Sequence, residues 1–393
     1  MRPHPLALHR QMNNLPATVA AAKQTSSARP GVLPRVEGMN EFIVILAMAA
    51  QLFFAVPALK TAQSTCEIVL FIVLLYACTT VTIGLGELAL LALLAVMGVA
   101  SMMINNLAVL LVGVKQFGLA ILCLIYFSRV RFRSRIILPA FVASVGLIFI
   151  SRLAPAVVAP LIQISRSPEF NESRFGGLFL NTHYNAYFLA VALVYYGYRV
   201  RLFGAGQLLI FLTGSKFVFV SYAANVAARY KVVRIFTRYP RSVLFAATIV
   251  AVVLWSRRLE LIGALNRTEW MSAYVIFSQL FDPQFYRLVL NPFPGDYLAV
   301  VNGLKGNFGA AQYTNEIALF AMCVQGGLFL TVAYLSVLLK HARPYRIFVL
   351  VSLLHYGFIL SPLIVYMIVT YSREIICLPG ASAKAEVSTL AVA

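Results

Sequence analysis

Acidic residues are scarce in this sequence. Its 393 residues include 13 Asp and Glu against 32 Lys and Arg, and aspartate occurs only as Asp282 and Asp296. Hard cations such as Mg²⁺ are bound by clustered carboxylates, so we expect no metal and no other cofactor. The five cysteines form no Cys-x-x-Cys pair, which argues against a zinc site or a disulfide framework. The sequence also has no Walker-type phosphate-binding loop, which argues against a self-contained ATP-driven pump.

Charge of either sign is scarce as well. Charged residues make up 11% of the chain and hydrophobic residues 61%, and the mean hydropathy is +0.84. A soluble domain is about 25% charged and about 45–50% apolar, so this composition excludes an ordinary cytosolic protein. Because a membrane-spanning helix takes about 20 residues, we predict an all-α, polytopic integral membrane protein. The basic residues cluster between apolar runs, where they set orientation, so we expect no nucleic-acid partner.

These basic clusters predict how the chain crosses the membrane, because Lys and Arg gather on the cytoplasmic side. Residues 1–40 are polar and contain no apolar core, so we expect a flexible cytoplasmic tail and no signal peptide. Four apolar runs then lead to an arginine cluster at 129–135, which we also place in the cytoplasm. The four runs are 41–59, 66–83, 87–104 and 107–127. A fifth run begins at residue 136, and Pro155 and Pro160 mark a re-entrant segment after it.

The later apolar runs are shorter or interrupted. Residues 202–228 lie between two basic clusters, so we expect a tight hairpin whose tip, Gly214-Ser215-Lys216, is accessible from outside. Residues 256–312 form the main external loop. The run 347–371 contains Ser361-Pro362 and is either one kinked span or two short ones. The remaining runs are 178–198, 242–255 and 313–339.

Together, residues 41–373 are expected to form a transmembrane domain of ten to twelve helices. Residues 374–393 form a C-terminal tail, and we expect both ends of the chain in the cytoplasm.

Polar residues gather at the outer end of the run 178–198. Arg174 is followed by a Gly-Gly pair and then by Asn181, His183 and Asn185 as the chain enters the apolar run. The glycines let the backbone approach another group closely, and unsatisfied polar groups are expensive in a membrane. The planar fork of an arginine binds phosphate through two hydrogen bonds, so Arg174 is a candidate for an anion site. Hydrogen bonds between helices are the simpler explanation for the two amides.

Two further stretches share this pattern. Thr213-Gly214-Ser215-Lys216 places small polar groups and a cation at the hairpin tip, where a plain turn is the simpler explanation. Asn315-Glu316 lies where the long loop re-enters the membrane, and Gln325-Gly326-Gly327 follows in the same run. Glu316 is either a charge favoured at a helix N-terminus or a general base. Arg258 and Arg287 add positive charge in the external loop.

These features together resemble the O-antigen ligase and polymerase superfamily of bacterial envelope proteins. The resemblance covers roughly residues 174–340 and rests on the Arg-x-x-Gly stretch, on a tip similar to the family's Thr-Gly-Ser-Arg, and on Asn-Glu and Gln-Gly-Gly after a large loop. Ligases of this family carry a His-Asn pair where this chain has Thr314-Asn315, so the resemblance favours a polymerase. Lys216 stands where the family has Arg, which keeps the charge without the bidentate geometry.

The resemblance implies a multi-pass glycosyltransferase of the bacterial inner (cytoplasmic) membrane. Such an enzyme would join polyprenyl-pyrophosphate-linked oligosaccharide repeat units into O antigen or exopolysaccharide at the outer face of that membrane. We expect the reaction to be inverting and metal-independent. The partners implied are the lipid-linked oligosaccharide, membrane lipid and other polysaccharide assembly proteins.

The resemblance also implies roles for individual residues. We expect Arg174 to clamp the pyrophosphate with help from Lys216 and from Arg258 or Arg287. The further substrate-binding candidates are Asn181, Asn185 and Asn315. His183 and Glu316 are the two candidates for the base that deprotonates the acceptor hydroxyl. Histidine is preferred because its unperturbed pKa of about 6.5 suits proton transfer near neutral pH.

Three alternatives to a polymerase stay open: an O-antigen ligase, a transporter or flippase for the same lipid, and a non-catalytic partner of a secretion system. A transporter is expected to have two similar halves and polar sites at the membrane midplane, and we find no repeat. Lys115 lies near the centre of the fourth span. We find no carboxylate partner for it in the neighbouring runs, so the sequence does not support a proton relay.

Overall fold

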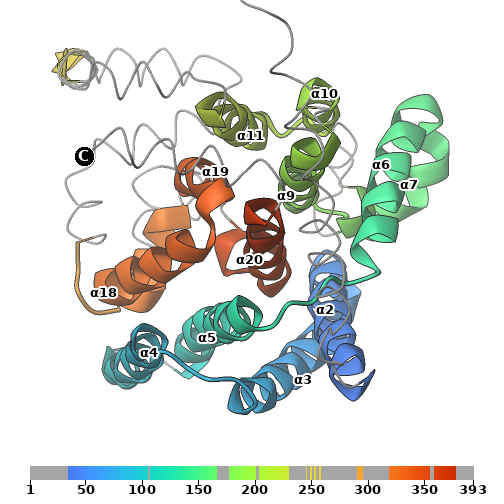
Figure 1. Ribbon diagram of the computed structural model, residues 1–393. Coiled ribbons are helices and arrows are strands. Elements are labelled where there is room, and N and C mark those ends of the chain that lie inside the picture. The colour runs from blue at the N-terminus through green and yellow to red at the C-terminus, as the bar shows by residue number, and fades with distance from the viewer. Residues whose placement is uncertain are drawn as a thin grey trace, which may run out of the picture. The chain divides into compact units, whose positions relative to one another are not determined.

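The computed structural model is helical throughout the part that it describes, with no strand there (Figure 1). The described residues are 34–104, 107–165, 177–200, 203–229, 290–294, 318–354 and 358–377, with a few single residues between 245 and 257. The chain divides into two compact units, Met1–Phe42 and Ile43–Ala393, and the contacts reported below lie within the second.

The first four predicted runs are long, uninterrupted helices. They are α2 (Pro34–Phe54), α3 (Lys60–Thr79), α4 (Leu85–Ile104) and α5 (Leu107–Arg129), with a short 3₁₀ turn, η1 (Pro57–Leu59), before α3. The predicted and observed ends agree within a few residues for α4 and α5. Helix α2 begins at Pro34, inside the stretch expected to be a flexible tail, because proline is well tolerated in the first turn of a helix.

The fifth run is bent sharply after Leu153. Helices α6 (Ile137–Leu153) and α7 (Pro155–Gln163) meet at an angle of 113°. Ala154 between them has φ −142° and ψ 69°, which is outside the helical region. A residue before proline is disfavoured in the α conformation, so Pro155 explains the break and begins the next helix. This agrees with the irregular segment expected at the two prolines.

The next segment contains the predicted hairpin. A 3₁₀ turn, η2 (Gly177–Phe179), precedes α9 (Thr182–Val200), and α10 (Phe203–Leu212) and α11 (Lys216–Arg229) follow. The three residues 213–215 connect α10 to α11, and Gly214 has a φ of +75°, which glycine adopts without strain. The predicted hairpin is confirmed as two helices joined by a turn, and of the predicted tip Gly214-Ser215-Lys216 the last residue belongs to α11.

The last part of the described chain is again interrupted. Helix α18 (Ala318–His341) is broken at Gly327, which has φ 76° and ψ 161°. It is followed by η3 (Arg343–Tyr345), α19 (Arg346–Ser352), η4 (Phe358–Leu360) and α20 (Pro362–Ile376). Of the two arrangements expected for residues 347–371, the structure has two separate helices. Helix α20 begins at Pro362, the residue that marked the kink in the sequence.

Helices α5, α9 and α20 supply much of the buried core, with α20 lying between the other two (Figure 1). Aromatic rings pack against each other where α20 meets α5 and where α20 meets α9. Tyr366 of α20 meets Phe127 of α5 edge to face at 4.6 Å, and Tyr371 of α20 stacks on Tyr195 of α9 at 4.1 Å. Such pairs favour one packing geometry over others beyond the area that they bury.

Within the described residues, four helical segments are long and apolar enough to cross a membrane, or five if the bent α6–α7 pair is one span. They are Glu37–Phe54, Pro57–Thr79, Leu85–Met103 and Ala321–His341. Helix α3 exposes Ile68, Ile72 and Tyr76, each at 59–65%, as lipid-facing helices do. The other helices in the described part of the chain are not among these candidates, and the count of ten to twelve spans stays a prediction.

Candidate functional site

The start of α9 and the α10–α11 turn meet at His183 and Ser215. The imidazole Nδ1 of His183 lies 3.1 Å from the hydroxyl oxygen of Ser215, within hydrogen-bond distance. The two residues are 32 positions apart and belong to two of the stretches singled out in the sequence. The fold therefore places a titratable group and a hydroxyl in contact at the hairpin tip.

The backbone at the start of α9 is strained. Leu180 has a φ of +49°, a value that is uncommon for a residue with a side chain, and Gly177 has a φ of +58°. A non-glycine residue in this region costs about 1–3 kcal/mol and persists only where the surrounding structure demands it. The segment that leads into His183 is thus held in a conformation that the chain would not adopt alone.

Asn185 is the most unusual polar side chain near this point. It is 1% exposed, and neither its amide nitrogen nor its carbonyl oxygen has a hydrogen-bond partner among the described residues. A Cβ atom on Gly177 would lie 2.4 Å from the amide nitrogen, so only glycine fits against this side chain. A buried carboxamide needs partners, so Asn185 is a polar group at the start of α9 that the described residues leave unsatisfied.

Asn181 has a structural role that the sequence analysis did not assign to it. Its side-chain oxygen accepts a hydrogen bond of 3.0 Å from the backbone N–H of Tyr184, which is the N-cap arrangement at the start of α9. The hydroxyl of Tyr184 lies 2.9 Å from that of Ser361, just before α20. These two contacts fix the first turn of α9, and with it the position of His183.

The hairpin tip is buried rather than open. Ser215 is 1% exposed and Thr213 is 1% exposed, so the expectation that the tip is accessible from outside is wrong for the Ser215 side chain. The hydroxyl of Thr213 donates a hydrogen bond to the carbonyl of Ile210 and accepts one from the backbone N–H of Ser215. Both hydrogen bonds stabilise the turn. Arg152 at the end of α6 donates to the carbonyl of Leu212 and anchors the tip from the side.

The other predicted site residues fall mostly outside the described residues. These are Arg174, Arg258, Arg287, Asn315 and Glu316. Lys216 is described as the first residue of α11, but its side chain is not. Of the proposed set, the described part of the structure brings His183 and Asn185 to one turn of α9, with Asn181 as its cap.

Lys115 does have a carboxylate partner, contrary to the sequence analysis. Its ammonium nitrogen lies 2.5 Å from a carboxylate oxygen of Glu67 on α3, and the two side chains are 34% and 12% exposed. Glu67 lies two turns into α3 and is 48 residues away in sequence, so the sequence alone gives no sign that it meets Lys115 of α5. The side-chain amide of Gln63, one turn earlier, also donates to Glu67.

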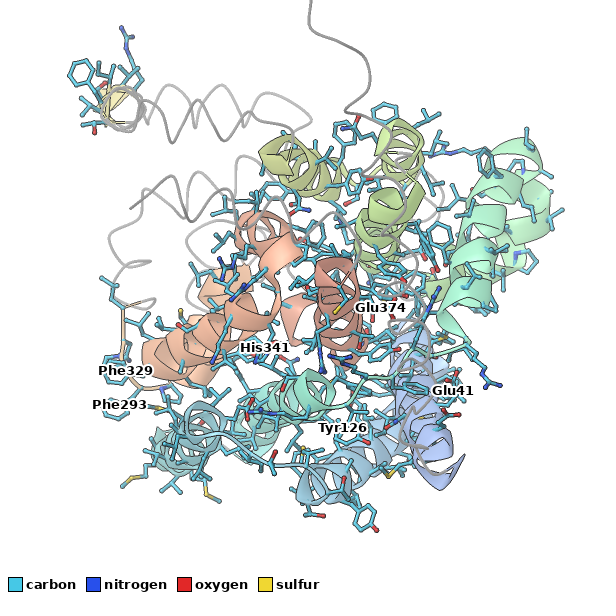
Figure 2. The ribbon with its side chains drawn as sticks, viewed as in Figure 1. Glu41, Tyr126, Phe293, Phe329, His341 and Glu374 are labelled. Atoms are coloured by element: carbon cyan, nitrogen blue, oxygen red, sulfur yellow. The ribbon has the colours of Figure 1, made fainter. Side chains whose placement is uncertain are left out.

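The Gln-Gly-Gly stretch marks a break in α18 that the sequence analysis did not predict. A Cβ atom on Gly327 would lie 2.5 Å from the carbonyl oxygen of Pro292, and the N–H of Leu328 donates to the carbonyl of Asn291. Figure 2 shows Phe293 and Phe329 together beside this break. The positive φ of Gly327 lets residues 291–293 pack directly on the helix backbone.

The contact between His183 and Ser215 allows proton transfer. In one tautomer of the imidazole, Nδ1–H donates to the serine oxygen, and in the other Nδ1 accepts from the serine hydroxyl. The arrangement thus holds a titratable side chain of α9 in contact with a hydroxyl of the α10–α11 turn. Comparison of the chain with protein-family models, with curated proteins and with solved structures finds no match.

Proposed function

We propose that the protein is a glycan polymerase of the bacterial cytoplasmic membrane. It joins polyprenyl-pyrophosphate-linked oligosaccharide repeat units into O antigen or exopolysaccharide on the outer face. The observation that carries the proposal is the contact between His183 and Ser215, at 3.1 Å. It joins the segment after Arg174 to the Thr-Gly-Ser-Lys turn, and both take part in the resemblance to the O-antigen polymerases.

In the proposed reaction, a hydroxyl of the acceptor sugar attacks the anomeric carbon of the donor sugar. The bond from that carbon to the pyrophosphate oxygen breaks, the configuration inverts, and the polyprenyl pyrophosphate leaves with the electron pair. His183 takes the proton of the attacking hydroxyl at Nε2. Arg174 and Lys216, with Arg258 or Arg287, stabilise the negative charge on the leaving group, so that no metal is required.

The proposal places the chain in the membrane with ten to twelve spans, both ends in the cytoplasm and residues 256–312 outside. It is supported by the exposed apolar faces of α3 and α4. Because Ser215 is buried, labelling is better directed at Lys60 and Arg135, which are exposed. We expect an impermeant thiol reagent to label Lys60→Cys but not Arg135→Cys in spheroplasts. The reverse pattern would overturn the topology.

The decisive test of the activity is a strain that lacks the protein. We expect it to make no long polymer and to accumulate lipid-linked single repeats, and wild-type protein but not His183→Ala should restore chain length. A strain that instead accumulates full-length polymer on its lipid carrier would identify a ligase. Purified protein should polymerise repeats in the presence of EDTA, and activity that requires added Mn²⁺ would contradict the metal-independent mechanism.

A transporter of the same lipid is the second candidate, and two observations favour it. One is the Glu67–Lys115 pair, which places opposite charges between apolar helices. The other is the break in α18, since broken helices are common at transport sites. Proteoliposomes separate the candidates: a polymerase forms new glycosidic bonds between lipid-linked repeats, whereas a flippase moves single repeats across the bilayer and forms none.

A further inference from the structure

A cavity of about 240 Å³ lies between the segment 130–133 and the last turns of α20. Its lining includes Arg131 and Arg133 from the segment that joins α5 to α6, and Thr370, Arg373 and Glu374 from α20. Figure 2 labels Glu374 on α20. From the sequence alone, the orientation of the chain in the membrane is a sufficient explanation for this arginine cluster.

The walls of this cavity are held in place by hydrogen bonds between the two segments. The hydroxyl of Tyr366 on α20 accepts a hydrogen bond of 2.7 Å from the backbone N–H of Ser134. Arg373 donates to the backbone carbonyls of Phe127 and Val130 at 3.3 and 3.2 Å. The cavity is therefore built by the packing of α20 on the end of α5.

The charges that line the cavity do not balance. Three guanidinium groups face one carboxylate, that of Glu374, which accepts a hydrogen bond from the hydroxyl of Tyr195. Arg133 lies over the ring of Tyr195, 5.6 Å from its centre. In the described part of the chain the two ion pairs found, Lys115–Glu67 and Arg129–Glu87, include none of the three lining arginines. The cavity thus carries an excess of positive charge.

Thr370 supplies an independent observation. It is 5% exposed, lines the cavity, and its hydroxyl has no hydrogen-bond partner among the described residues. Leaving a buried hydroxyl without a partner destabilises the folded state. Burial, and then the positive charge of Arg131, lower the pKa of Arg373, which lies beyond the predicted apolar run 347–371. Both the hydroxyl and the crowded cations would be satisfied by an anion with several acceptor oxygens.

We propose that this cavity binds a phosphoryl group, with Arg131, Arg133 and Arg373 neutralising its charge and the Thr370 hydroxyl donating a hydrogen bond. Arginine forks match phosphate oxygens. The volume is below the range of about 300–1,000 Å³ that is usual for drug-sized ligands, which suits a phosphate and its nearest substituent. Basic pockets on the cytoplasmic side of membrane proteins bind lipid headgroups, and free phosphate offers the same chemistry. This binding is independent of the proposed polymerase activity.

The test measures the unfolding temperature of the purified full chain in a non-ionic detergent. The two probes are dihexanoylphosphatidylglycerol and inorganic phosphate, titrated at constant ionic strength against chloride. We expect at least one probe to raise the unfolding temperature saturably. Arg131→Ala should weaken its apparent affinity about tenfold or more, as for the loss of a charged hydrogen bond. Arg135→Ala, a matched loss of charge four residues away, should leave the affinity within about twofold.

Thr370→Val is the second variant, because it removes the hydroxyl and keeps the shape of the side chain. We expect it to weaken binding about threefold to tenfold without lowering the unfolding temperature in the absence of probe. Stabilisation by the phospholipid alone identifies a lipid headgroup site, and stabilisation by both probes identifies a phosphate site. Failure of both probes, or equal losses in Arg131→Ala and Arg135→Ala, would overturn the proposal.

Discussion

The early and the late helices of this protein are built differently. Helices α2 to α5 are each continuous over 20 to 23 residues. From residue 137 onward, the described helices include a pair bent at Pro155, a helix broken at Gly327 and one of only seven residues, α19, although α9 is continuous over 19 residues. All residues with positive φ in the described chain, Gly177, Leu180, Gly214 and Gly327, belong to this later part.

The two parts of the chain also differ in their polar contacts and in their backbone conformation. The polar contacts of the early helices are ion pairs that satisfy their own members, such as Arg129 with Glu87 at 2.6 Å. The later part contains the strained backbone at Leu180 and the unsatisfied amide of Asn185. Backbone strain is often concentrated at functional sites, and the proposed site lies in the part of the chain where the helices are irregular. The predictions below test this contrast.

The largest effect is expected at His183. His183→Ala should lower the polymerisation rate about 10²- to 10⁴-fold, because a general base is lost. Ser215→Ala should lower it about tenfold, since the base remains but loses a hydrogen bond that orients it. Ser336→Ala is the matched control, because the Ser336 hydroxyl is exposed and donates to the carbonyl of Val332 in its own helix, α18. The measurement is polymer formed by purified protein, and a normal rate in His183→Ala would remove the proposed site.

Arg174 is expected to come next. Arg174→Ala should lower the rate about 10²- to 10³-fold, as is typical when a charge-stabilising donor is lost. Arg174→Lys should be nearly as damaging, because a point charge does not replace the planar fork. The same polymerisation assay checks both variants. A well-folded and correctly inserted Arg174→Ala that still builds long polymer at the normal rate would place the pyrophosphate elsewhere.

A smaller effect, on stability, is expected at the break in α18. Gly327→Ala should lower the free energy of unfolding by about 1–3 kcal/mol, because the new methyl group meets the backbone of residues 292 and 293 and the φ is positive. Gly146→Ala in α6 is the control: a Cβ there meets nothing within 4 Å, so it should be neutral or stabilising by up to about 1 kcal/mol. Denaturant unfolding compares the two. Equal effects would mean that the break is not required by packing.

The smallest effect is expected for the ion pair of the early helices. The coupling between Glu67 and Lys115 in a double-mutant cycle with Glu67→Gln and Lys115→Met should be about 1 kcal/mol or less, because Lys115 is 34% exposed. Polymerisation should be unaffected in the double variant. If the double variant lost activity but kept its stability, the functional site would include the early helices, and the transporter would be favoured.

Part of the fold follows from local pattern. The apolar runs at 87–104 and 107–127 became α4 and α5 nearly unchanged, since length and composition decide whether a helix forms. Pro155 and Pro362 begin helices where the sequence placed interruptions, and Gly214 forms the turn of the predicted hairpin. These are short-range effects of proline and glycine on φ. The break at Gly327 was missed because a Gly-Gly pair inside an apolar run is compatible with a continuous helix.

The sequence by itself determined the helical class, the ends of several helices and the stretches that carry polar chemistry, because these depend on composition and on neighbours along the chain. Only the tertiary structure decided that His183 meets Ser215, that Lys115 pairs with Glu67, and that Asn185 lies against Gly177. It also turned an arginine cluster and Thr370 into the lining of one cavity. Such contacts join residues from different helices, and their distances are set by how the helices pack rather than by any local pattern.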